Sequence, residues 1–241
     1  MAAFAGQPPA LKNSSQLIVV TTADWNAVDG RLQMYQRRSA GGGWKAMGAP
    51  IAIAVGKAGM AWGMGVAPMD DVRRSSDPIK REGDHKSPAG IFRLGDAFGY
   101  AASEPAGWKM KYISLSPSTD CVDDSRSRFY NQVVDSSTVS PDWKSSEHMR
   151  DAGEAYRWGL VIQHNAHPVR PEDGSCVFMH IWGGPGDGTE GCTAMPEPQV
   201  ISILGWLKPS ANPLLVQMPI QQYQRLAKAM SLPAPPTAAE P

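Results

Sequence analysis

The stretch Cys176-Val-Phe-Met-His180-Ile-Trp-Gly-Gly-Pro-Gly-Asp-Gly-Thr189-Glu-Gly191-Cys192-Thr-Ala-Met195 contains an apolar segment with one histidine, then a Gly-rich loop, then a cysteine. Successive side chains of a strand point to opposite faces of the sheet. Both faces of this apolar segment are hydrophobic, which is typical of a strand in the centre of a sheet. The segment therefore predicts a central strand, with Cys176, Phe178, His180 and Trp182 on one face and Val177, Met179 and Ile181 on the other.

Short apolar or alternating runs, separated by Gly, Pro, Asp and Asn, recur along the chain and predict further short strands. Together they indicate a mainly β fold, a sandwich or a barrel. Two short helices are expected near the C-terminus, at 196–207 and 219–232, because apolar residues recur there at helical spacing. The region 101–157 is rich in Ser, Asp and Pro, which predicts long surface loops or a lid. The strands are expected at 17–22, 32–36, 51–55, 112–115, 158–164, 177–182 and 214–218.

A single domain is expected over residues 16–232, because neither a linker nor an internal repeat interrupts this range. Residues 1–15 are small and polar, and residues 233–241 are rich in proline, so both ends are predicted to be disordered. Ala3-Phe4-Ala5 resembles the small-residue end of a secretory signal, although no basic or apolar region precedes it. A remnant of signal processing is one interpretation of this end.

The charge balance and the hydropathy pattern argue against two classes of partner. The chain has 23 basic and 23 acidic residues and a formal net charge of zero, which gives no reason to expect nucleic acid or an anionic membrane as a ligand. No apolar run approaches the roughly 18 to 20 residues that cross a bilayer, so no membrane insertion is expected. We expect a monomer.

The chain has three cysteines, so at most one internal disulfide can form. If Cys192 is the free thiol, Cys121 and Cys176 are the pair available. The residues alone favour three reduced cysteines over this disulfide, and an oxidising compartment would reverse that preference.

His180 and Cys192 have the chemistry of a general base and a nucleophile. A thiol attacks as the thiolate, and the glycines before Cys192 leave room for a substrate. The helix expected at 196–207 begins soon after Cys192, so its free amides and positive dipole end would stabilise a thiolate. Those amides, with the amides of Gly191 and Cys192, would form an oxyanion hole. The alternative is a buried cysteine and a core histidine without a catalytic role, and spacing alone does not decide between the two.

Two motifs together resemble one known family. His180, the Gly-rich loop and Thr189-Glu190-Gly191-Cys192 resemble the active-site signature of the L,D-transpeptidase catalytic domain, also called the YkuD or ErfK type. Upstream, Ser87-Pro88-Ala89-Gly90-Ile91-Phe92 is similar to the family's Thr/Ser-Pro-x-Gly-x-Phe element, which ends in a strand. Two motifs in the family's order are more specific than either alone, and the likeness spans roughly residues 17–232.

The resemblance implies a YkuD-type β-rich fold in which Cys192 is the nucleophile and His180 the general base. It implies that the backbone carbonyl of the next residue, Ile181, orients the imidazole. The implied substrate is the peptide stem of bacterial peptidoglycan, cut after the L-configured centre of diaminopimelate to give a thioester on the cysteine. It also implies a periplasmic or secreted enzyme of cell-wall remodelling that needs no cofactor.

Two positions depart from the family's pattern. Many members carry His before the Gly-Cys pair and Arg or Asn two residues after the cysteine, where this chain has Glu190 and Ala194. Gly-Cys-Thr-Ala-Met resembles a divergent branch that includes hydrolytic members. An amine acceptor would give transpeptidation, and water would give L,D-carboxypeptidase or amidase activity. A non-catalytic wall-binding module on the same fold is a third alternative.

Other polar residues are weaker candidates for substrate binding. Tyr130-Asn131 and His164-Asn165 are candidates to line the substrate groove, although polar loop residues more often form turns. Basic side chains suit the carboxylates of a stem peptide, because guanidinium binds them bidentately, but they are equally suited to be solvated surface charges. The basic candidates are Arg81, Lys86, Arg126 and Arg128, and the substrate-binding set adopted is Thr189, Glu190, Lys86, Tyr130, Asn131 and Asn165.

A metal centre is the competing chemistry, and we do not expect one. The chain lacks the paired spacing, such as Cys-x-x-Cys, that sets zinc geometry. The loop at 183–188 lacks the Gly-Lys-Ser/Thr ending of a phosphate-binding loop, so it is interpreted as an active-site loop. The residues of zinc-ligand type considered are His164, His167, Cys176, His180 and Cys192.

Overall fold

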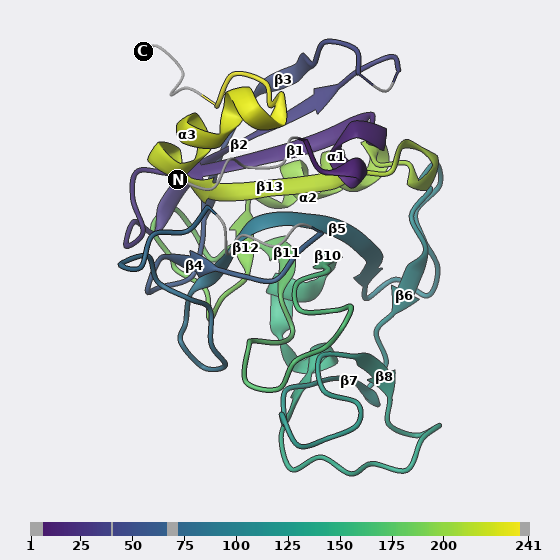
Figure 1. Cartoon of the computed structure of the whole chain (residues 1–241). Helices are drawn as coiled ribbons and strands as arrows, with labels where there is room; N and C mark the ends of the chain where they lie inside the picture. Colours follow the sequence, from purple (N-terminus) through teal and green to yellow (C-terminus); the bar gives the residue numbers. More distant parts are fainter. Residues whose placement is uncertain (1–6, 40, 67–71, 237–241) are drawn as a thin grey trace.

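The computed structural model of the chain describes residues 7–39, 41–66 and 72–236. Within these ranges a mixed barrel of eight strands forms in the order β10-β11-β12-β3-β2-β1-β13-β5, and the pairing of β5 with β10 closes it (Figure 1). The prediction of a mainly β fold is confirmed. The barrel strands are β1 (Gln16–Thr22), β2 (Asp29–Gln36), β3 (Lys45–Ala54), β5 (Ser87–Gly99), β10 (Trp158–Ile162), β11 (Phe178–Ile181), β12 (Thr193–Met195) and β13 (Leu214–Pro219).

The longest strand, β5, was expected only as the end of the Ser87–Phe92 motif. Pro88, Gly90, Gly95 and Gly99 interrupt its apolar pattern, and close packing requires Gly99, where a Cβ would lie 2.4 Å from the Arg157 carbonyl oxygen. Nearby, Gly159 of β10 faces Phe98 of β5, where a Cβ would lie 2.2 Å from the ring atom Cζ. Two short strands, β4 (Met60–Trp62) and β6 (Tyr112–Ser114), also run parallel to β5.

Three helices pack on this framework in the described residues. The two predicted C-terminal helices are present as α2 (Glu197–Trp206) and α3 (Ile220–Met230). The N-terminal end, expected to be disordered over residues 1–15, contains α1 (Pro9–Asn13), whose Leu11 is fully buried. The Arg37 guanidinium donates hydrogen bonds to three carbonyls of this end, those of Leu11, Lys12 and Ser14. Residues 1–6 lie outside the described residues.

The predicted alternation of side chains in residues 176–182 is confirmed, because the two faces of this segment contact two different hydrophobic clusters. Val177, Met179 and Ile181 belong to the main hydrophobic cluster, which the barrel strands share with α2 and α3. Phe178, on the opposite face of β11, belongs to a second cluster. The members of this second cluster are Phe98, Leu115, Cys121, Met149, Tyr156, Phe178 and Cys192.

The region 101–157, expected to be loops or a lid, also contains regular structure. Its strands β7 (Thr119–Val122), β8 (Val133–Asp135) and β9 (Ser146–His148) form an antiparallel sheet in the order β8-β7-β9. Two 3-10 turns, η1 (Met149–Asp151) and η2 (Gly153–Tyr156), connect this sheet to β10. The sheet lies at the end of the molecule opposite α1 and α3 (Figure 1), and we call the region 116–157 the small lobe.

A disulfide joins Cys121 of β7 to Cys176, two residues before β11. The expectation of three reduced cysteines was therefore wrong. The sequence pattern did not show that the small lobe packs against the start of β11, where the two Cα atoms lie 5.9 Å apart, within bonding range. Cys192 remains free and buried.

Removing this disulfide in the double variant Cys121→Ser/Cys176→Ser is expected to lower the free energy of unfolding by about 4 kcal/mol. The bond closes a loop of 55 residues, and the chain-entropy model assigns about that loss to a loop of this length. Urea titration of wild type and variant measures the change. Reductant should lower the stability of the wild type and leave the variant unaffected; equal midpoints for the variant and the oxidised wild type would contradict the prediction.

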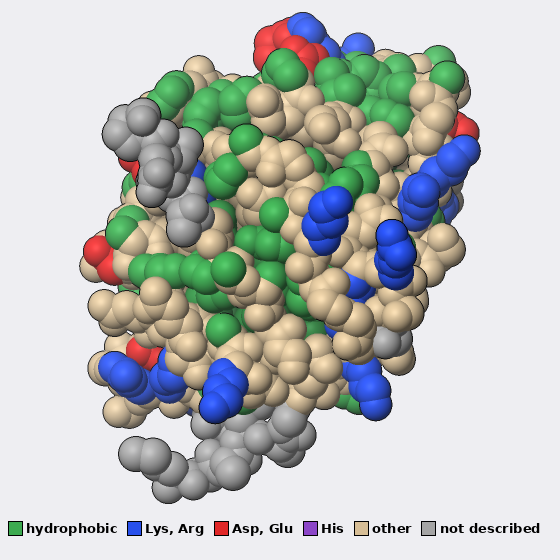
Figure 2. Space-filling model, turned by 90° about the horizontal axis from the view of Figure 1, so that it is seen from above, with side chains coloured by type: hydrophobic (Ala, Val, Ile, Leu, Met, Phe, Trp, Pro, Cys, Tyr) green, Lys and Arg blue, Asp and Glu red, His purple; other side chains and the backbone are tan. Residues whose placement is uncertain are grey.

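On one face of the molecule the Lys and Arg side chains do not gather into a single patch. Figure 2 shows the face above β3 and α3, on which Lys and Arg side chains are spread among hydrophobic and uncharged ones. Among the described residues, no helix is both long and apolar enough to cross a bilayer.

Candidate active site

The sheet register places the two predicted catalytic residues close together along β11, with Cys192 beside its first residue and His180 two residues further on. Strand β11 lies between β10, antiparallel to it, and β12, parallel to it, and His180 is paired with Ala194. Cys192 immediately precedes β12, so it lies beside Phe178, whose N–H donates a hydrogen bond to the Cys192 Sγ at 3.3 Å. The Gly-rich loop thus returns the cysteine to the strand that carries the histidine. Cys192 is 8 % exposed and His180 is 9 % exposed.

The His180 imidazole is oriented by a backbone carbonyl, as the resemblance implied. Its Nδ1 lies 2.8 Å from the Ile181 carbonyl oxygen, and a proton on Nδ1 leaves the Nε2 lone pair free to accept another. Burial lowers the pKa of His180 below its ordinary value. The neutral imidazole is therefore the form present near pH 7, and it is the form that a general base requires.

The Cys192 thiol is protonated at neutral pH. Burial raises its pKa to about 12, and the negative charge of Glu147 acts in the same direction, whereas the Phe178 N–H and the Tyr156 hydroxyl lower it. The expectation that the following helix stabilises a thiolate was wrong. Strand β12 separates Cys192 from the start of α2, and three extended residues span roughly 10 Å. A base must therefore remove the thiol proton during the reaction.

The backbone around Cys192 is held by two hydroxyl groups. Ser87 Oγ donates to the Cys192 carbonyl at 2.8 Å, and Thr189 Oγ1 donates to the same oxygen at 2.6 Å. Ser87 also accepts a hydrogen bond from the Gly56 N–H at 2.9 Å, so the upstream motif and the cysteine loop meet at this serine. Gly191 has φ +145°, a conformation that side chains disfavour.

The Gly191 and Cys192 amides, both proposed for an oxyanion hole, differ in whether they already have a hydrogen-bond acceptor. The Gly191 N–H donates to Thr189 Oγ1 at 3.1 Å, so it is already engaged. Among the described residues, the Cys192 N–H has no backbone or side-chain acceptor. The cysteine's own amide is therefore the donor left available to an oxyanion.

Glu190 ties the cysteine loop to two neighbouring loops. Its carboxylate forms an ion pair with Lys57, at 2.5 Å, and also contacts Nδ1 of the His85 ring. Lys57 is the main cause that lowers the pKa of Glu190. The side chain is 71 % exposed, so this cluster forms an open rim beside Cys192.

A cavity of about 710 Å³ opens beside Cys192 and His180. It is lined by the cysteine loop, by the end of β11 and by the small lobe. Cys192 and His180 do not hydrogen bond to each other in this structure, and catalytic hydrogen bonds are often long before substrate binds. The Tyr156 ring packs against the His180 ring, with 5.3 Å between the ring centres. Besides His180, the acidic and basic side chains in the lining of the cavity are Lys80, Glu82, His85, Asp123, Glu147, Asp187 and Glu190.

Of the six predicted substrate-binding residues, Thr189 and Glu190 line this cavity and the other four do not. The Tyr130 hydroxyl donates to the Glu82 carboxylate. The Asn131 side chain donates to the carbonyls of His164 and Asn165 and accepts from the Cys176 N–H. These residues support the segment that leads into β11.

Asn165 and Lys86 also bond to the backbone. The fully buried Asn165 side chain donates to the carbonyls of Arg170 and Gly174, and the Lys86 ammonium donates to the Ala58 carbonyl. Polar side chains in irregular loops frequently satisfy the backbone in this way. Their role as substrate ligands stays a prediction.

The remaining candidates have structural partners. His164 is buried, and both of its ring nitrogens are hydrogen bonded, Nδ1 to the Met64 N–H and Nε2 to the Asp173 carbonyl. Burial lowers its pKa to about 4. Cys176 is in the disulfide, and no metal-binding group of three or more side chains occurs in the described part of the chain. The arginines form ion pairs, Arg81 with Asp173, Arg126 with Asp124 and Arg128 with Asp142.

Three side chains at the site were not identified from the sequence. Ser87 had a signal, because it opens the upstream motif. Tyr156 and Glu147 had none, because they lie in the aperiodic region before β10 and their proximity to Cys192 depends on how the small lobe packs.

Comparison with known proteins agrees with this geometry. No curated protein and no solved structure gives a significant match. The family model of the L,D-transpeptidase catalytic domain, YkuD, matches residues 23–217, a range that holds both motifs and every barrel strand except β1 and the end of β13. This family acts in peptidoglycan cross-linking, and the disulfide is consistent with its extracytoplasmic setting. The chain therefore belongs to the YkuD family of L,D-transpeptidase catalytic domains.

Proposed function

We propose that this protein is a cysteine L,D-transpeptidase that forms a Cys192 thioester with the stem peptide of peptidoglycan. The observation that carries the proposal is the shared cavity, whose lining includes the free thiol of Cys192 and the imidazole of His180, whose Nδ1 bonds to the Ile181 carbonyl. Family membership supplies the substrate class. No cofactor is required for this chemistry.

The proposed reaction has two halves. His180 Nε2 takes the proton from the Cys192 thiol, and the sulfur attacks the carbonyl on the L-centre of diaminopimelate. The Cys192 N–H supports the oxyanion until the C–N bond breaks and the imidazolium protonates the departing amine. An acceptor then gives its proton to His180 and attacks the thioester, which releases the sulfur.

Hydrolysis is the second candidate, because the residues that flank Cys192 are unusual for the family. Glu190 is engaged with Lys57 and His85, and the buried Ala194 presents only a methyl group where many members carry Arg or Asn. With water as the acceptor, the same thioester would give L,D-carboxypeptidase or amidase activity. Thr189 and Glu190 are the side chains proposed to contact substrate.

The deciding experiment incubates purified disaccharide tetrapeptide with the protein, with and without an added D-amino acid, and measures product masses. Exchange of the terminal residue supports the transpeptidase, and release of tripeptide alone supports the hydrolase. No product, combined with cell-wall binding that survives Cys192→Ala, would overturn both and favour a wall-binding module.

We further propose a periplasmic or secreted location. The Cys121–Cys176 disulfide persists where the environment is oxidising, and the proposed substrate lies outside the cytoplasm.

A further inference from the structure

We infer that Tyr156 and Glu147 form a pair that sets the reactivity of the Cys192 thiol. In this pair the Glu147 carboxylate positions the Tyr156 hydroxyl, and that hydroxyl turns from the carboxylate to the sulfur when the thiol loses its proton. The inference rests on the proposed function in one respect, that Cys192 is the nucleophile.

The Tyr156 side chain is fixed on several sides. It is 4 % exposed, and its ring makes edge contacts with Phe98 at 5.3 Å, Phe178 at 5.6 Å and His180 at 5.3 Å between ring centres. Aromatic edge contacts of this kind have a preferred geometry, so the ring has little freedom to turn away. Its neighbours also include Cys192, which belongs to the same buried cluster.

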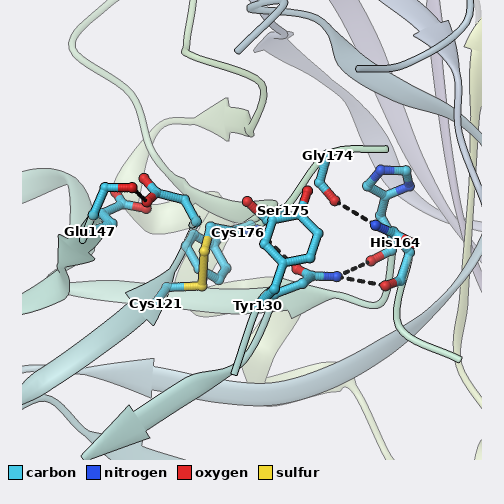
Figure 3. The surroundings of a disulfide bond; sticks show 12 residues. Cys121, Tyr130, Glu147, His164, Gly174, Ser175 and Cys176 are labelled. Atoms are coloured by element: carbon cyan, nitrogen blue, oxygen red, sulfur yellow. Dashed lines mark hydrogen bonds between the residues drawn. A yellow bond between two sulfur atoms is a disulfide. The ribbon is translucent and has the colours of Figure 1, made fainter. Parts of the chain in front are cut away.

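The Tyr156 hydroxyl bonds to a carboxylate in the cavity that also holds Cys192. It donates its one proton to Glu147 Oε1 at 2.5 Å, while the Cys192 thiol donates to the Cys176 carbonyl at 3.8 Å. Glu147 comes from β9 in the small lobe, whereas Cys192 comes from the barrel. The disulfide holds the same two parts together next to this contact, with Glu147 beside Cys121 and Cys176 (Figure 3).

Glu147 is a carboxylate without a cationic partner among the described residues. Burial raises the pKa of Glu147, and hydrogen bonding from Tyr156 opposes this effect. The charged or titratable groups that share the cavity near it are Asp123, Lys80, Tyr156 and His180. Lys80 is engaged by Asp84, at 2.5 Å, so it does not neutralise Glu147.

The two members of the pair act on the thiol in opposite directions. A hydroxyl that turns its proton to the sulfur stabilises the thiolate, and a nearby negative charge destabilises it. The result is a thiol that stays protonated until His180 takes its proton in the presence of substrate. A protonated, buried thiol resists oxidation better than a thiolate, which is useful in an oxidising compartment.

The test measures the rate of Cys192 alkylation by iodoacetamide between about pH 7 and pH 10, followed by intact mass, since thiolate is the reacting form. Glu147→Gln keeps the hydrogen bond and removes the charge, so it is expected to speed alkylation by about tenfold at each pH, the effect of one pKa unit. Tyr156→Phe keeps the ring and removes the hydroxyl, so it is expected to slow alkylation by about tenfold. A merely structural role would not move the two rates in opposite directions.

Matched controls separate this inference from the proposed function. Tyr112→Phe removes a hydroxyl that bonds to Ala101 outside the cavity, so it should leave the rate unchanged. If Glu147→Gln fails to fold, Glu147→Asp keeps the charge and should stay closer to the wild-type rate. Equal rates for wild type, Tyr156→Phe and Glu147→Gln would overturn the inference alone. A wild type that turns over no muropeptide and forms no adduct at Cys192 would overturn the proposed function.

Discussion

Replacing Cys192 by alanine is expected to abolish both turnover of muropeptides and the covalent adduct with a carbapenem. Both reactions require attack by a sulfur atom on a carbonyl, and alanine offers no nucleophile. Cys192 is the one free thiol of the three cysteines, because Cys121 and Cys176 are bonded to each other. Intact-protein mass should therefore show a single adduct on the wild type and none on the variant.

The control for this prediction is the variant without the disulfide, Cys121→Ser/Cys176→Ser. It keeps Cys192 and should keep the adduct at a temperature where it is folded. An adduct that persists in Cys192→Ala, or a folded wild type that never forms one, would show that Cys192 is not the acylated residue.

Replacing His180 by glutamine is expected to lower kcat by about 10² to 10⁴, the usual contribution of a general base. Glutamine fits the buried site with an amide in place of the ring, but it does not take up a proton near neutral pH. Because burial lowers the pKa of His180, the wild type should keep its activity to a lower pH than an ordinary imidazole would allow. Below that pKa the imidazole is protonated and activity falls, so kcat/KM against pH should show an acidic limb that His180→Gln lacks.

His164→Gln is the matched control for His180, since it changes the other histidine that is buried and hydrogen bonded. We expect it to lower stability and to leave the acidic limb in place. If the limb survives in His180→Gln, another group is the base, and the assignment of His180 fails.

The β-strands that the sequence predicted are those in which hydrophobicity is continuous or alternating. Residues 17–22 and 214–218 are mostly apolar and buried on both faces, and both are barrel strands. Strand β5 escaped prediction because glycines that let neighbouring backbones approach closely also remove the apolar signal. The strands of the small lobe are three or four residues long, and so short a segment shows no periodicity.

The contrast between local sequence patterns and tertiary packing also explains which residues of the site could be predicted. His180 and Cys192 lie within one short stretch of sequence, so local spacing and two motifs identify them. Asn131 was expected to bind substrate, yet it adopts a left-handed conformation at φ +61° and bonds to backbone groups. Glu147 and Tyr156 reach Cys192 through tertiary packing, which no local pattern records.

The parallel pairing of β1 with β13 has a consequence for how the protein is made. It joins Leu17 to Leu214, so the barrel remains open until residue 214 and the rest of β13 have been synthesised. Until then β1, which is buried along its whole length in the finished fold, has one unpaired edge on which other chains can add strands. A chain that terminates before residue 214 should therefore aggregate rather than fold, because β13 is the strand that covers the open edge of β1.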